Sequence, residues 1–284
     1  MSTPAEEQRL QAQQQERAAL LADSTVNALT AARTSLGFAA ETADEVDRHL
    51  RRSEDDILEL GGQVNRIRYA GDEPQRTGED VAVEVHRQFG SAQELAGDID
   101  RRLRAGTSGL RDAQDHLEQS ARAIAAGRQF VGELEQLPGQ QNERTAQLRE
   151  RLANLDRAVH GAMDGVERTG SRLTAARRNL EPVLEGRAYT DDPARTAAIV
   201  NEASSTVDRD VLNARNSIRT LREDFDTTRP DVAAAARDSD ELATAIRAGT
   251  NPTPRAQQTA SASQPEDPRR GWSEGRDLGH DIKR

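Results

Sequence analysis

The chain has 284 residues, of which 35% are hydrophobic, 2% aromatic and 31% charged, and its formal net charge is −10. A globular domain of this length usually has close to half apolar residues, so the composition points either to disorder or to long helices with a narrow apolar seam. The absence of cysteine excludes disulfides and thiolate chemistry, and no region is basic enough to indicate binding to nucleic acid or to anionic membranes.

The first predicted helix covers residues 5–69. Apolar or small residues recur in alternating steps of three and four from Leu29 to Ile67, which is the spacing of a heptad seam. Thr3 followed three residues later by Glu6 predicts a capping box at the start of this helix.

The second predicted helix covers residues 79–137. Gly71 and Pro74 interrupt the chain before it, because neither residue favours a continuing helix. The same seam, with alternating steps of three and four, then runs from Ala82 to Leu134. From Leu110 to Gly127 its large and small residues alternate, so we expect the helix to approach its neighbours closely.

The third predicted helix covers residues 141–184 and follows a turn that contains Pro138 and Gly139. Its seam runs from Leu148 to Val183 with the same spacing. Strict alternation with a period of two is absent, so we expect no sheet.

The fourth predicted helix covers residues 193–248, with Asp192 as its N-cap. Its seam runs from Val200 to Ile246. The register continues across Pro230, which lacks an amide hydrogen and predicts a bend rather than a break.

These elements predict an all-α fold in residues 1–248: an elongated antiparallel helical bundle or coiled coil of four long helices, arranged up-down-up-down. No stretch approaches the length of a transmembrane span, and the N-terminal residues do not form a standard signal peptide. Self-association into a homodimer stays open, because four seams can satisfy one another or pair with a second copy.

Residues 249–284 differ from the rest of the chain. They have no seam and are rich in Pro, Ser, Thr and Gln, which predicts a disordered tail. The tail contains the single tryptophan of the chain, Trp272, followed by Leu278 and Ile282. We interpret these three residues either as incidental or as a short recognition peptide anchored by tryptophan.

Catalytic and metal-binding patterns are missing from the sequence. Glu45 with His49, and Asp112 with His116, have the spacing for a shared metal, but such pairs are commonly solvated ion pairs on a helix face. The acidic stretch Ser53–Glu59 is equally typical of an exposed face. We therefore predict no enzyme activity, no cofactor and no metal.

Two tyrosines stand in predicted connections between helices. Tyr69 opens the segment Tyr69–Glu73, which resembles the Tyr-x-x-x-Asp/Glu export signal of type VII secretion substrates. That family carries the signal after the second helix of a hairpin, beside a Trp-x-Gly turn, whereas here it follows the first helix and no Trp-x-Gly is present. Tyr189 lies in the third connection, so we expect Tyr69 and Tyr189 to be near neighbours at one end of the bundle. There they either pack as a cap on the tip or form a partner-binding patch.

The sequence thus favours a non-enzymatic scaffold or protein-interaction protein, located in the cytoplasm, with an unidentified protein partner. The alternative is a leaderless exported or injected substrate whose helical bundle is a carrier module. Of the 39 basic residues all but one are arginine, which is typical of a GC-rich bacterial source.

Overall fold

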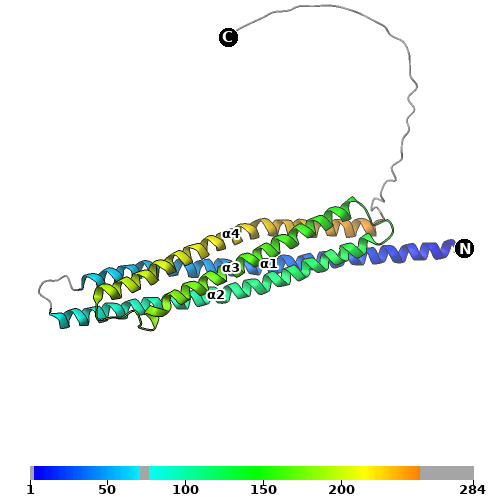
Figure 1. The fold of residues 1–284 in the computed structure, drawn as a ribbon. Helices are drawn as coiled ribbons and strands as arrows, with labels where there is room; N and C mark the ends of the chain where they lie inside the picture. The colour runs from blue at the N-terminus through cyan, green and yellow to red at the C-terminus, as the bar shows by residue number, and fades with distance from the viewer. Residues whose placement is uncertain (1–2, 71–76, 250–284) are drawn as a thin grey trace, which may run out of the picture. The chain divides into compact units, whose positions relative to one another are not determined.

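The structure is a computed structural model that describes residues 3–70 and 77–249. These residues form four α-helices and no strands, which confirms the predicted fold class (Figure 1). The helices are α1 (Pro4–Tyr69), α2 (Gly78–Glu135), α3 (Glu143–Leu184) and α4 (Pro193–Arg247).

Each helix lies between two neighbours. α1 contacts α2 and α4, and α3 contacts the same two helices, while the diagonal pairs have almost no contact. The side-chain amide of Gln15, near the start of α1, donates a hydrogen bond to the carbonyl oxygen of Ile246, near the end of α4, at 2.7 Å. α1 and α4 are therefore antiparallel, as are the helices joined by short connections (Figure 1).

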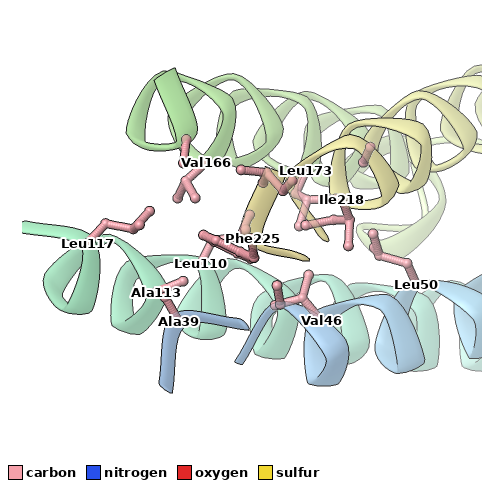
Figure 2. Close-up of a cluster of buried hydrophobic side chains, with 14 of the residues drawn as sticks. Ala39, Val46, Leu50, Leu110, Ala113, Leu117, Val166, Leu173, Ile218 and Phe225 are labelled. Carbon is pink, nitrogen blue, oxygen red and sulfur yellow. The ribbon is translucent and has the colours of Figure 1, made fainter. Parts of the chain in front are cut away.

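The core follows the predicted seams. Every seam position of the four predicted helices is buried except Ala82, which is exposed. Figure 2 shows one section of this core, where Val46 and Leu50 of α1 face side chains contributed by the other three helices. The seam of α1 also continues toward its start, because Ala18, Ala22 and Thr25 are buried as well.

Ala82 is exposed because α3 is shorter than its neighbours. The amide of Gln93 donates to the carbonyl oxygen of Leu184, the last residue of α3, at 3.3 Å. The first turns of α2 therefore lie beyond the end of α3, so that the prediction of a buried residue at position 82 was wrong.

The helix ends are fixed by side-chain caps. Thr3 and Glu6 form the predicted capping box, and the hydrogen bonds from Thr3 lower the pKa of the Glu6 carboxyl. Asn142 accepts hydrogen bonds from the backbone amides of Arg144 and Thr145, so α3 begins two residues later than predicted. Asp192 caps α4 as predicted by accepting from the amide of Ala194.

Two glycines allow neighbouring helices to approach closely. A Cβ atom added to Gly109 of α2 would lie 2.8 Å from Cγ2 of Val46 on α1, which is too close for two carbon atoms. A Cβ added to Gly165 of α3 would lie 3.0 Å from Cδ2 of Leu221 on α4. Neither glycine is a position of the predicted seams, so these two close approaches were not predicted from the alternation of large and small seam residues.

Candidate interaction surface

Tyr189 packs at the end of the bundle where α1 ends and α4 begins. Its ring lies 5.5 Å from the ring of Phe89 and meets the His86 ring edge-on at 5.5 Å, measured between ring centroids. The preceding residue, Ala188, is fully buried. The connection between α3 and α4 therefore covers the part of the core that α3 is too short to reach.

Tyr69 does not belong to this aromatic cluster. It is the last residue of α1 and is 57% exposed, and among the described residues it makes no ring contact. An aromatic cluster therefore exists near this end, but the partners of Tyr189 come from α2. Tyr69 stays available to solvent, whereas Glu73, the other end of the proposed export signal, lies outside the described residues.

The proposed recognition peptide lies outside the described residues. Trp272, Leu278 and Ile282 all fall in residues 250–284, so the structure does not test that prediction.

Asp47 of α1 is a buried carboxylate on the boundary with α4. It pairs with Arg51 one turn along its own helix at 2.8 Å, and it lies 3.5 Å from the guanidinium nitrogens of both Arg215 and Arg222 on α4. A carboxylate that is largely removed from water in this way is stable only when charged groups surround it.

Asp100 of α2 has the same role on the boundary with α3. It pairs with Arg104 on its own helix at 2.7 Å and with Arg177 of α3 at 2.8 Å. Both aspartates stand in the pattern Asp-Arg-x-Leu-Arg, at residues 47–51 and 100–104. The α1–α2 hairpin is thus joined to the α3–α4 hairpin by one buried carboxylate on each of its helices.

The acidic stretch Ser53–Glu59 also takes part in these contacts. Glu54 pairs with Arg215 of α4, and Asp56 pairs with Arg102 of α2. Two of its carboxylates therefore connect α1 to its neighbours, and the interpretation of the whole stretch as a solvated face was incomplete.

The histidines with metal-compatible spacing do not come together. Within residues 3–70 and 77–249, no group of three or more His, Asp or Glu side chains has the geometry of a metal site. His116 lies against the exposed ring of Phe38, with 5.3 Å between the ring centroids. Its Nδ1 atom is buried and has no hydrogen-bond partner among the described residues.

The surface hollows of the bundle are open grooves between neighbouring helices. One groove, of about 550 Å³, lies between α2 and α3, and the buried side chains Leu110 and Val166 contribute to its lining. Arg111 of α2 and Arg178 of α3 also line it. We call this feature the α2–α3 groove. The sequence did not single it out, because it depends on which helices become neighbours.

No known protein-family model matches the chain, and no curated protein or solved structure is significantly similar to it. None of the helices in the described part of the chain is long and apolar enough to cross a membrane.

Proposed function

We propose that this chain is a non-enzymatic scaffold protein whose helical bundle holds bound partners at a fixed separation. The observation that carries the proposal is the pair of buried aspartates, each bound by arginine from the other hairpin. Together with a continuous apolar core, these contacts favour one alignment of the two hairpins over shifted ones. A bundle with one alignment has one length, which is the property that a spacer needs.

The surface of the bundle supports the same proposal. Large apolar side chains are exposed on several helices, including Leu58 on α1, Val83 on α2 and Leu212 on α4. Single exposed apolar side chains are ordinary on a protein surface, and a partner that covered these would bury their apolar area. The grooves are open to solvent. They can therefore contact the surface of a partner protein, but they do not enclose a small substrate.

Site-specific photo-crosslinking in the native cell tests this function. A photoreactive phenylalanine analogue replaces Leu58, Val83 or Leu212 in turn, and the adducts are identified by mass spectrometry. A scaffold gives reproducible adducts with the same one or two proteins at each contacted position. The absence of adducts at all three positions, with the protein folded and abundant, would contradict the proposal.

The second candidate is an exported helical carrier. The observation in its favour is that Tyr69, the first residue of the Tyr-x-x-x-Glu segment, is exposed at the end of α1 and thus accessible to a secretion receptor. Fractionation of intact cells separates the two candidates, because a scaffold of the cytoplasm stays in the cells. Export predicts protein in the culture medium and a loss of that protein after Tyr69→Ala.

A further inference from the structure

We propose that the α2–α3 groove is a docking site for an acidic amphipathic helix of a partner protein. This inference rests on the proposed interaction function and names the surface and the chemistry of one partner. Three observations support it: the local charge, the unpaired arginines and the apolar floor of the groove.

The two helix segments that border the groove are basic in a chain that is acidic as a whole. The groove is lined from within residues 107–114 of α2 and 166–178 of α3, which together contain five arginines and two acidic residues, while the whole chain has a net charge of −10. This concentration of positive charge lies in the middle section of two adjacent helices. An acidic partner would therefore be attracted to this section of the surface more than to the rest of the molecule.

Some of these arginines, together with Arg102 and Arg104 just before the groove, are already used within the bundle. Arg102 pairs with Asp56 of α1, and Arg172 donates to the carbonyl oxygen of Asn213 on α4. Arg104 and Arg177 share one carboxylate, that of Asp100. Arg104, Arg177 and Asp100 together carry a net positive charge about one helical turn away from the groove.

Arg111 and Arg178 are the groups that a partner would meet. Both are exposed, both line the groove, and neither forms an ion pair or hydrogen bond with another described residue. They project from different helices, so one carboxylate-bearing segment in the groove can contact both. Glu167 also lines the groove, and it would repel a carboxylate placed at its position.

The floor of the groove suits a helix with one apolar face. Leu110 and Val166 are only 3% and 4% exposed, and the glycine at position 170 leaves the floor without a side chain there. The hydroxyl groups of Thr107 and Thr174 donate hydrogen bonds to carbonyl oxygens of their own helices. Because Leu110 and Val166 are almost fully buried, the floor offers only shallow apolar contact, and the guanidinium groups would supply most of the contacts to a partner helix.

Charge also argues against a second copy of this chain as the occupant. In a twofold symmetric contact through this groove, Arg111 and Arg178 of one copy would face the same arginines of the other. Like charges placed opposite one another across an interface disfavour association. The apolar floor likewise favours a protein helix over nucleic acid, which would need phosphate contacts along a longer basic track.

Fluorescence anisotropy with a designed peptide tests the proposal. The probe is a labelled peptide of three identical heptads, with Leu and Ala at the packing positions, two Glu in each heptad and Gln at the others to limit charge repulsion along the helix, and the control peptide has Lys in place of every Glu. We expect the Glu peptide to bind the full chain and the Lys peptide not to bind. Equal binding of both peptides, or binding of neither, would overturn the proposal, and so would equally tight binding of a short DNA duplex.

Charge-reversal variants locate the binding site. Arg111→Glu with Arg178→Glu should weaken binding of the Glu peptide roughly tenfold or more. The matched control is Arg219→Glu with Arg237→Glu, which reverses two exposed arginines of α4 without a described partner and should leave binding within about twofold. Equal effects of the two double variants would show that the peptide senses net charge and not this groove.

A third variant tests the floor without changing charge. Gly170→Leu places a side chain in the groove and should weaken binding, whereas Gly170→Ala should have a smaller effect because its Cβ lies 3.9 Å from Leu110. Circular dichroism confirms that each variant is folded.

Sedimentation tests the alternative that a second copy of this chain occupies the groove. If the native chain is a dimer that becomes monomeric after Arg111→Glu and Arg178→Glu, the groove belongs to a second copy. Peptide binding is measured on the purified chain, whereas the scaffold function is tested by crosslinking in the cell. A failure of the groove proposal can therefore be told apart from a failure of the proposed scaffold function.

Discussion

Arg177 on α3 donates its Nε–H to Oδ1 of Asp100 on α2 at 2.8 Å, and this contact crosses from one helical hairpin to the other. Asp100→Ala should therefore reduce the free energy of unfolding by about 1–3 kcal/mol, because Arg177 and Arg104 lose the carboxylate that they share. Urea denaturation measures the change. Asp98→Ala is the control, since the exposed pair that Asp98 forms with Arg101 should contribute less than about 1 kcal/mol. Equal losses in both variants would argue against a special role for the buried carboxylate.

The close approach of α1 and α2 makes one glycine sensitive to substitution. Gly109→Ala should destabilise the protein by about 1–3 kcal/mol, because the new Cβ would lie 2.8 Å from Val46 and force the helices apart. Gly132→Ala on the same helix has no atom within 4 Å of the new Cβ, so it should stabilise the protein by up to about 1 kcal/mol through helix propensity. Thermal unfolding of the two variants should shift in opposite directions, and a shift in the same direction would contradict this packing.

The two tyrosines should respond differently to truncation. Tyr189→Ala removes the ring that contacts Phe89 and His86 and should cost about 1–3 kcal/mol of stability. Tyr69→Ala removes an exposed ring and should change stability by less than about 0.5 kcal/mol. Chemical denaturation of both variants checks this difference, which also establishes that Tyr69→Ala can be used in an export assay without unfolding the protein.

The titration of Asp224 should make the effect of its substitution on stability depend on pH. Partial burial, together with the neighbouring Glu223, raises the pKa of the Asp224 carboxyl above its ordinary value. The folded state therefore binds the proton of this carboxyl more tightly than the unfolded state, so protonation of Asp224 favours folding. This stabilisation is complete at a pH below the carboxyl's pKa in the unfolded state, and it is lost as the pH rises through the carboxyl's pKa in the folded state. Asp224→Asn should raise the melting temperature at neutral pH and leave it nearly unchanged at acidic pH, below the unfolded pKa. An equal shift at both pH values would exclude this titration as the cause.

The helices and most of the core could be predicted from the sequence, because the heptad spacing is a local property. The positions from Leu29 to Ile67 are buried as expected, and the caps at Thr3 and Asp192 formed because each depends only on residues within one turn. Ala82 is the exception. Its exposure depends on the length of α3, which the spacing of apolar residues in α2 does not predict.

The contacts that define the candidate interaction surface depend on which helices become neighbours. Asp47 and Asp100 are polar residues beside the seam, and nothing in their local sequence distinguishes a buried carboxylate from an exposed one. Their importance depends on Arg215 and Arg177, which are distant in the sequence. The partners of Tyr189 were missed for the same reason, since the offset between α2 and α3 brings Phe89 to its ring.

The most direct test of a spacer of fixed length is a distance measured along the bundle. The chain has no cysteine, so spin labels can be attached through Leu20→Cys and Leu58→Cys, both of which replace exposed residues of α1. A continuous helix with a rise of about 1.5 Å per residue places their Cα atoms about 57 Å apart. Pulsed electron paramagnetic resonance should give a single narrow distribution near this distance. A broad distribution, or one centred at a clearly shorter distance, would contradict the account.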